Sequence, residues 1–275
     1  MIKLFITGGT GFIGKAFINE ALKKNYFIYA LTRKKNKKNI KNLKWLHGSI
    51  DSNWLKELHD SDILIHFASA GVVKKKISFM NTFSTNVLES YQLLINAIRA
   101  NCKKWIIIGS CYENIFENKE KEFFFTKNKY FNYTFSKFMF TKLSLLLSKK
   151  FKCKCRVLRL FHVYGEGENK NRMWPSLIKA AKSGKNFKMS KGEQKRDFIN
   201  INETINIILD TLNFKKNSNF FPQLWHVGSG RNISIKKFAN HVWKNQKAKG
   251  KILFNKIKND DNINYVSKKK LLWKL

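Results

Sequence analysis

Roughly the first 165 residues alternate short apolar runs with longer stretches in which apolar residues recur at helical spacing. The apolar runs predict strands at Lys3–Thr7, Phe27–Leu31, Ile63–Phe67, Trp105–Gly109 and Cys155–Leu160. The periodic stretches predict helices at Ile13–Lys24, Thr82–Ala100 and Asn132–Lys149. Strands that alternate with helices are typical of a parallel sheet covered by helices on both faces. The pattern therefore predicts an α/β fold built on a doubly wound parallel sheet.

The alternation loosens beyond about residue 165, which predicts a smaller second part of the chain. The elements expected outside the alternating pattern are a solvated connection at Lys34–Lys44, a helix at Arg172–Gly184, a strand at Leu224–Val227 and a Ser-capped helix at Ser234–Asn245. We therefore expect a main domain over residues 1–165, which the strand near 224–227 joins, and a lobe formed mostly by residues 166–275.

The net charge of +36 invites a nucleic-acid hypothesis. Only seven of the 54 basic residues are Arg, and the Lys residues are spread along the whole chain together with abundant Asn, Ile and Phe. These four residue types have A/T-rich codons, so mutational bias alone would produce the composition. We expect a lysine-coated surface that binds polyanions weakly at low salt, and no specific nucleic-acid partner.

The remaining composition favours a cytoplasmic enzyme without a metal. No apolar run reaches the roughly 18–20 residues of a membrane helix, and the start of the chain lacks the layout of a signal peptide. The four Cys residues show no paired C-x-x-C spacing, so free thiols in a reducing compartment are expected. The six His residues form no ligand spacing.

A glycine-rich loop follows the first predicted strand directly and leads into a helix. Its sequence, T-G-G-T-G-F-I-G, satisfies G-x-G-x-x-G through Gly9, Gly11 and Gly14, and also G-x-x-G-x-x-G through Gly8, Gly11 and Gly14. Glycines allow the tight turn and the close approach of backbone to a pyrophosphate, which the helix N-terminus then faces. The predicted cofactor contacts in this loop are Gly8, Gly11, Phe12, Ile13 and Gly14.

The second strand indicates which dinucleotide binds. An NAD site usually places an acidic residue about 20 residues past the loop, but this chain has no acid between Glu20 and Asp51. Arg33 and Lys34 follow the strand instead and could pair with a 2′-phosphate. Arginine is scarce here, so Arg33 carries more weight than its lysine neighbours. We expect NADP(H) to be favoured, with NAD(H) as the alternative.

Three residues form a candidate catalytic set. Tyr133 and Lys137 stand four residues apart on a predicted helix, so both project from one face. Ser110 lies just past an apolar strand, at the carboxyl end where α/β sheets place their sites. A cation beside the Tyr133 phenol lowers its pKa toward the range useful for proton transfer. We expect Tyr133 to act as general acid/base, Lys137 to supply the charge and hold the nicotinamide ribose, and Ser110 to bind the reacting oxygen.

Taken together, these motifs resemble the extended short-chain dehydrogenase/reductases, particularly the NAD-dependent epimerase/dehydratase family, which modifies nucleotide sugars. The resemblance runs from residue 3 to the end of the chain. It is carried by the glycine loop, Leu64–Ala68, Asn86, Ser110, Tyr133 with Lys137, Arg159–Gly165, Gly192–Phe198 and Val227–Gly230. It implies a Rossmann-type dinucleotide-binding domain over residues 1–165 and a substrate-binding lobe over 166–275.

The resemblance also implies further site residues. His162, Trp174 and Arg196 would bind the substrate, with Arg196 facing the diphosphate or nucleotide through its bidentate guanidinium. Ser49 and Ile50 stand where the family has an adenine-contacting Gly-Asp-Ile, so they are expected at the cofactor although Ser49 replaces the acid. His162 replaces a usual Asn and could instead be a packed core histidine. The residue after Arg196, Asp197, is expected to be structural.

Three functions remain open on this evidence. The leading hypothesis is NADPH-dependent reduction of an NDP-4-keto-6-deoxyhexose, a step toward polysaccharide sugars, because a reductase exchanges its cofactor at each turnover. A nucleotide-sugar 4-epimerase with tightly bound NAD is the second. A non-catalytic dinucleotide- or RNA-binding relative is the third, and the intact Ser110, Tyr133 and Lys137 argue against it. The expected partners are a nucleotide-sugar substrate and, as one option, a second copy of the chain in a homodimer.

Overall fold

The computed structural model describes the chain except for residues 36, 72–77, 118–129, 215–221 and 257–275. Contacts divide it into two compact units. The first contains residues 1–160 and 205–225 among those described, and the second contains residues 161–204 and 226–256. The chain thus leaves the first unit after residue 160 and returns to it with residues 205–225. None of the described helices is both long and apolar enough to cross a membrane.

A seven-stranded sheet forms the centre of the first unit, in the order β10-β6-β5-β4-β1-β2-β3. The strands are β1 Lys3–Thr7, β2 Phe27–Thr32, β3 Leu43–His47, β4 Ile63–His66, β5 Lys104–Ser110, β6 Lys154–Leu160 and β10 Gln223–Val227. The pairings from β3 across to β6 are parallel. The order from β3 to β6 is that of a doubly wound dinucleotide-binding sheet, and it confirms the predicted fold class.

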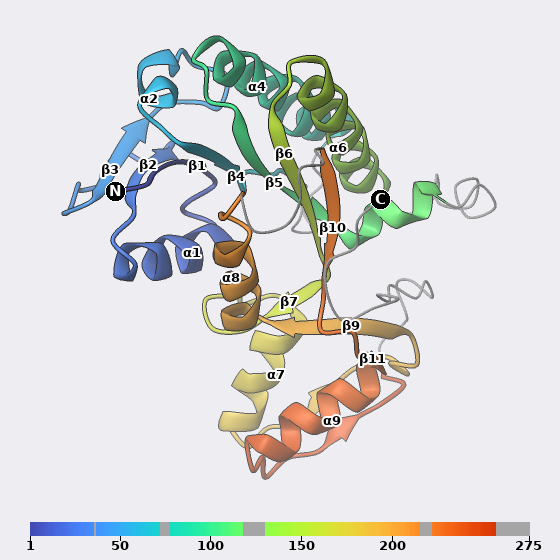
Figure 1. Cartoon of the computed structure of the whole chain (residues 1–275). Coiled ribbons are helices and arrows are strands. Elements are labelled where there is room, and N and C mark those ends of the chain that lie inside the picture. Colours follow the sequence, from blue (N-terminus) through green and yellow to red (C-terminus); the bar gives the residue numbers. More distant parts are fainter. Residues whose placement is uncertain (36, 72–77, 118–129, 215–221, 257–275) are drawn as a thin grey trace. The chain divides into compact units, whose positions relative to one another are not determined.

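Helices cover both faces of this sheet (Figure 1). They are α1 Phe12–Lys23, α2 Leu55–His59, α3 Phe79–Phe83, η1 Ser84–Glu89, α4 Ser90–Arg99, the short η2 Cys111–Glu117, α6 Phe131–Lys150 and α8 Ile201–Asp210. Figure 1 shows α2, α4 and α6 along one face and α1 on the other. Apolar side chains from the strands pack under α4 and α6 around the fully buried Trp105 and Phe140. This core fixes the carboxyl ends of the strands, where the site residues lie.

Two expectations about this unit are wrong. Lys34–Lys44 is not only a connection, because its last two residues begin β3, in which Leu43 and Leu46 are buried while Lys44 and His47 are exposed. Thr82–Ala100 is not one regular helix either. It contains the π-helical segment η1 between α3 and α4. π-helical turns are rare and frequently occur at functional sites.

The second unit is built from small sheets and two helices. Its elements are β7 His162–Tyr164, α7 Met173–Lys182, β8 Phe187–Lys188, β9 Lys195–Asn200, β11 Asn232–Ser234, α9 Ile235–Asn245 and β12 Ile252–Leu253. The helices α7 and α9 pack against each other. The rings of Phe198 and Phe238 stack at 3.8 Å between centroids, within a core that includes Leu177 and Val242. The Ser234 side chain accepts a hydrogen bond from the Lys237 amide, which confirms the predicted Ser cap.

Candidate active site

The glycine loop is held by close backbone contacts that only glycine permits. Gly8 has φ +71°, and a Cβ there would lie 2.5 Å from the amide nitrogen of Ala68 after β4. A Cβ on Gly14, in the first turn of α1, would lie 2.3 Å from the Gly8 carbonyl oxygen. By contrast, a Cβ on Gly9 would come closest to the end of the Ile18 side chain. The wider spacing, Gly8–Gly11–Gly14, is therefore the one that shapes the loop.

The same loop leaves the N-terminus of α1 ready for an anion. Gly11 is the N-cap, no side chain caps the helix, and Phe12 and Ile13 form the first helical positions. The first amide groups of a helix have no partner within it and attract phosphate. The loop lies at the carboxyl end of β1, beside β4, where the chain changes direction across the sheet. The residues present thus fit the pyrophosphate of a dinucleotide, as the sequence predicts.

The predicted adenosine contacts lie at the ends of β2 and β3. Arg33 follows β2 directly and its side chain is exposed. The Ser49 hydroxyl donates a hydrogen bond to the Asp51 carboxylate, and the Trp54 indole donates to the Ser49 carbonyl at 2.9 Å. Ile50 packs against the core. Asp51 therefore places a carboxylate beside Ser49, two residues after the position at which the family motif has its acid. This carboxylate was not among the residues predicted from the sequence.

The structure brings the three predicted catalytic residues to the carboxyl end of β5. Ser110 is the last residue of that strand, whereas Tyr133 and Lys137 lie in the first two turns of α6. The Lys137 ammonium donates to the Ile108 carbonyl of β5 at 2.5 Å. Tyr112 connects the other two: its amide donates to Ser110 Oγ at 3.3 Å, and its ring meets the Tyr133 ring edge-on at 6.4 Å between centroids.

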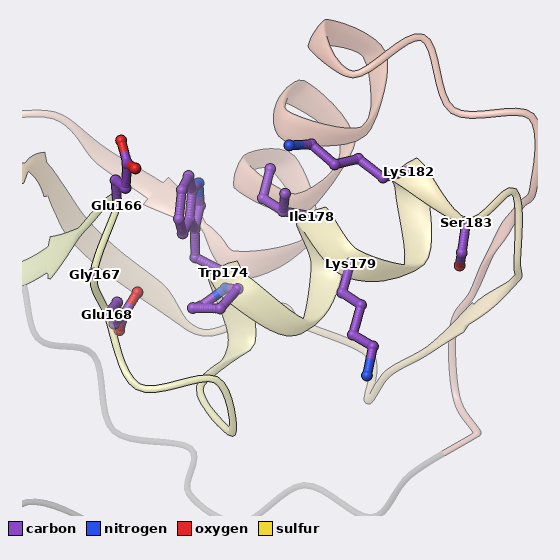
Figure 2. Close-up of a pocket in the computed structure, with 9 residues that line it drawn as sticks. Glu166, Gly167, Glu168, Trp174, Ile178, Lys179, Lys182 and Ser183 are labelled. Carbon is purple, nitrogen blue, oxygen red and sulfur yellow. The ribbon is translucent and has the colours of Figure 1, made fainter.

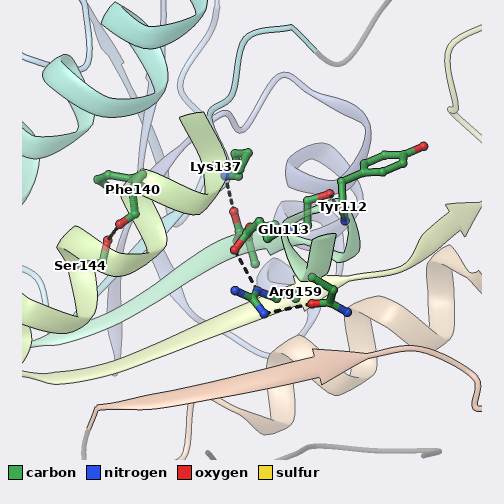
Figure 3. Close-up of polar contacts among 9 residues, drawn as sticks. Tyr112, Glu113, Lys137, Phe140, Ser144 and Arg159 are labelled. Carbon is green, nitrogen blue, oxygen red and sulfur yellow. Dashed lines mark hydrogen bonds and ion pairs between the residues drawn. The ribbon is translucent and has the colours of Figure 1, made fainter. Parts of the chain in front are cut away.

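Beneath these residues lies a buried ion pair that sequence reasoning missed. Glu113 and Arg159 are both fully buried, and Arg159 Nε donates to Glu113 Oε2 at 2.8 Å (Figure 3). The other carboxylate oxygen accepts the Ser110 amide at 2.7 Å. In Figure 3, Glu113 lies between Arg159 and Lys137. Glu113 thus neutralises a buried arginine and fixes the backbone of Ser110 at once. A lone acid after a strand gives no local signal of burial.

The charge of Lys137 is set by its surroundings. Burial lowers the pKa of Lys137 to about 8, and the Glu113 carboxylate raises it in opposition. Burial is the main cause that lowers the pKa of His66 to about 3, and the positive charge of Lys137 lowers it further. This histidine is therefore neutral at pH 7. His66 lies 2.8 Å from Thr7 Oγ1 through Nδ1 and 3.1 Å from Ser90 Oγ through Nε2. It ties β4 to β1 and α4 without adding a second charge beside Lys137.

Asn86, in the π-helical segment η1, positions the catalytic helix. Its side-chain oxygen accepts the Ala70 amide at 2.7 Å, and its nitrogen donates to the Ala70 carbonyl at 3.1 Å and to Ser136 Oγ at 2.9 Å. Ser136 in turn donates to the Tyr133 carbonyl at 2.8 Å. One side chain therefore links the loop after β4 to the turn of α6 that carries Tyr133 and Lys137.

All three predicted substrate residues belong to the second unit. His162 begins β7, Trp174 is in the first turn of α7, and Arg196 is a buried residue of β9. Burial holds the pKa of His162 well below its usual value, and the charges of Arg196 and then Arg172 lower it further. The histidine therefore lies within electrostatic reach of two guanidinium groups, and it is neutral.

Asp197 has the structural role that was expected. Its carboxylate accepts from the Ser229 amide, the Ser229 hydroxyl and the Gly230 amide at 2.7–2.9 Å. A Cβ on Gly228 would lie 2.4 Å from the same carboxylate, so the turn needs glycine there. These contacts hold the Val227–Gly230 turn against β9 beside Arg196.

The sheet order and the glycine loop are those of a Rossmann-type dinucleotide-binding protein. A sequence profile of the NAD dependent epimerase/dehydratase family matches residues 4–221. The chain therefore belongs to this family, and it is an enzyme of the class that uses an NAD(P) dinucleotide to modify nucleotide sugars.

Named relatives span nearly the whole chain. CDP-abequose synthase of Salmonella muenchen is 26% identical over 265 residues, which cover 95% of this chain and 87% of the relative. dTDP-4-dehydro-6-deoxyglucose reductase of Escherichia coli is 24% identical over 258 residues, with 87% and 80% covered. Among solved structures, UDP-glucose 4-epimerase of Thermotoga maritima has a TM-score of 0.78 at 17% identity, covering 97% of this chain and 90% of that one. This last likeness shows the fold.

The loop geometry predicts a sharp difference between two glycines. Gly14→Ala should weaken NADP(H) binding at least about 10-fold, because its Cβ forces the Gly8 backbone to move at a cost of about 1–3 kcal/mol. Gly9→Ala should change affinity by less than about 3-fold, since Ile18 can turn its methyl group away. Titration of cofactor fluorescence measures both. Equal losses in the two variants would contradict the loop assignment.

The buried pair predicts a shift in pH dependence. Lys137 carries its charge below its pKa of about 8, so kcat/KM on a confirmed nucleotide-sugar substrate should fall as pH rises through that value. Glu113→Gln removes the charge that raises this pKa, and the alkaline limb should move to lower pH. The amide is a reasonable replacement, because Arg156 on β6 is already buried against the neutral Gln223, 2.9 Å from its Nε.

Gln223→Met is the matched control for this experiment. It also removes the partner of a buried arginine, so it should lower the melting temperature. Gln223 lies on β10, which β6 separates from the strand β5 that accepts from Lys137, so the alkaline limb should stay where the wild type has it. An unchanged limb in Glu113→Gln would show that the carboxylate does not act on Lys137.

Proposed function

We propose that the enzyme is an NADPH-dependent reductase that acts on an NDP-4-keto-6-deoxyhexose. The observation that carries the proposal is Arg33, an exposed cation directly after β2 in a chain with no acid between Glu20 and Asp51. A guanidinium at the end of the second strand suits a 2′-phosphate, whereas an NAD site uses a carboxylate there. Cells keep NADPH for reductions, so this preference favours a reductase.

Two relatives support the type of reaction. The Escherichia coli relative is a dTDP-4-dehydro-6-deoxyglucose reductase, and a second, from Aggregatibacter actinomycetemcomitans, is a GDP-6-deoxy-D-talose 4-dehydrogenase that is 24% identical over 216 residues. Both names describe oxidation or reduction at C4 of a nucleotide-linked 6-deoxy sugar. The same position of the sugar is the reacting carbon in our proposal.

The side chains divide the chemistry between them. A bound nicotinamide supplies the hydride in such a reduction. Tyr133 donates its phenolic proton to the oxygen of the sugar carbonyl, and Ser110 Oγ donates a hydrogen bond to the same oxygen. The Lys137 ammonium, held by the Ile108 carbonyl, favours the phenolate that remains and binds the nicotinamide ribose. In the second unit, Arg196 binds the diphosphate, with His162 and Trp174 at the sugar and nucleotide.

The homodimer stays a prediction. Leu88 in η1 and Leu146 in α6 are 55% and 67% exposed, on segments that pack against each other. Exposed apolar side chains on neighbouring helices support an interface with a second copy.

Cofactor preference tests the role of Arg33. The wild type should bind NADPH about 10- to 150-fold more tightly than NADH, the value of one charge-assisted phosphate contact of about 1.5–3 kcal/mol. Arg33→Ala should remove most of that difference by weakening NADPH alone. Equal affinity of the wild type for both cofactors would contradict the proposal and favour the 4-epimerase.

Loss of the Tyr133 hydroxyl tests the chemistry. Tyr133→Phe should reduce turnover at least about 100-fold in NADPH oxidation assays with nucleotide 4-ketosugars, the usual contribution of general acid–base catalysis. Cofactor affinity should stay within about 3-fold, because the hydroxyl acts on the sugar. Lys137→Ala should damage both. Wild-type turnover in Tyr133→Phe would show that the assigned mechanism is wrong.

A further inference from the structure

The second unit contains a hollow of about 730 Å³ along α7 (Figure 2). Figure 2 shows Glu166 and Glu168 on the loop before this helix, and Trp174, Ile178 and Lys182 along the helix itself. The volume is in the range of small-molecule sites. Of the three predicted substrate residues, Trp174 is the one that lines it.

One residue that lines this hollow, Glu168, has a carboxylate oxygen without a hydrogen-bond partner in the part of the chain that the structure describes. The Glu168 side chain is only 7% exposed, and its Oε1 accepts from Arg172 Nε at 3.0 Å. Its Oε2 is buried and has no hydrogen-bond partner among the described residues. Burial raises the pKa of Glu168, an effect that Arg172 partly opposes. Buried polar atoms are normally paired, so Glu168 Oε2 is an unused hydrogen-bond acceptor at the edge of the hollow that its residue lines.

The strongly basic composition of the chain does not predict acidic residues in the lining of this hollow. The chain has 18 acidic against 54 basic residues, yet the hollow has two glutamates on one loop. A half-buried indole, Trp174, lies in the same lining and offers an apolar ring face on which a base can stack. Arg172 connects the hollow to the residues that we assign to the substrate. Its guanidinium donates to Glu168, and its charge also lowers the pKa of His162.

We propose that Glu168 Oε2 accepts a hydrogen bond from the exocyclic amino group of the substrate's nucleobase, whose ring lies on Trp174. The inference rests on the proposed function and narrows it to nucleotide sugars whose base carries an amino group. In uracil and thymine the ring N–H lies between two carbonyl oxygens. These two oxygens would be repelled by the negative charge of a carboxylate that accepts from the N–H. Arg172 Nε donates to Glu168 Oε1 at 3.0 Å, so a guanidinium stands beside this carboxylate and can donate to the single ring acceptor that flanks the amino group of cytosine.

CDP and UDP form the probe pair, because they differ only in the amino group of cytosine against the carbonyl and ring N–H of uracil. Calorimetric titration of the full chain should show CDP binding about 10- to 150-fold more tightly than UDP, the value of a hydrogen bond to a charged group. Glu168→Gln should reduce that ratio to less than about 3-fold by weakening CDP. Its affinity for UDP should not fall, which shows that the site is still folded.

Glu203→Gln is the matched control, since it removes the same charge from an exposed position of the second unit that lies outside the lining of the hollow. It should keep the wild-type ratio of CDP to UDP affinity. Equal binding of CDP and UDP by the wild type, or a ratio that survives Glu168→Gln, would overturn the inference. NADPH oxidation with a uridine- or thymidine-linked 4-ketosugar at the rate of the cytidine-linked one would overturn it too, while leaving the proposed reductase intact. A CDP preference without NADPH oxidation would count against the reductase alone.

Discussion

The active site depends on keeping one positive charge, the Lys137 ammonium, inside the core of the first unit. Its side chain is almost fully buried, and desolvation alone would favour the neutral amine. Three arrangements oppose this: the Ile108 carbonyl accepts a hydrogen bond from the ammonium, the Glu113 carboxylate supplies a nearby negative charge, and His66 stays neutral. Glu113 can supply that charge only because Arg159 pairs with it in turn. An unpaired buried carboxylate would cost several kcal/mol. The Lys137 ammonium of α6 therefore depends on a chain of charges that it forms with Glu113 of η2 and Arg159 of β6.

The sheet places this chain of charges next to the cofactor loop. β1 and β4 are neighbours, and β5 follows β4, so the glycine loop and Ser110 lie at the same edge of the sheet. Asn86 then fixes α6 against the loop that follows β4. The regular elements thus bring the glycine loop and Ser110 to one edge of the sheet, whereas the proposed preference for NADPH depends on an exposed residue, Arg33.

The sequence predicted the parts of the site that follow from local pattern. The glycine spacing, the order of strands and helices and the four-residue separation of Tyr133 from Lys137 are visible without a structure. β3 was hidden because the lysine-rich stretch before it resembles a solvated connection, and its two buried residues, Leu43 and Leu46, are three apart and do not show the two-residue alternation of a strand. The π-helical turn at Asn86 was missed because the apolar spacing of this stretch is that of a regular helix, and the hydrogen bonds of Asn86 to Ala70 join residues distant in sequence. Glu113 and Glu168 were missed for a related reason: burial of a single acid depends on tertiary packing, and nothing beside either residue in the sequence reports it.

The most direct test of the account follows the hydride itself. The enzyme is incubated with NADPH that carries two deuterium atoms at C4 of the nicotinamide and with a nucleotide 4-ketosugar, and the products are measured by mass spectrometry and NMR. The account predicts one deuterium at C4 of the sugar for each NADP⁺ formed. Conversion of a nucleotide sugar with no deuterium in the product and no net oxidation of NADPH would contradict it.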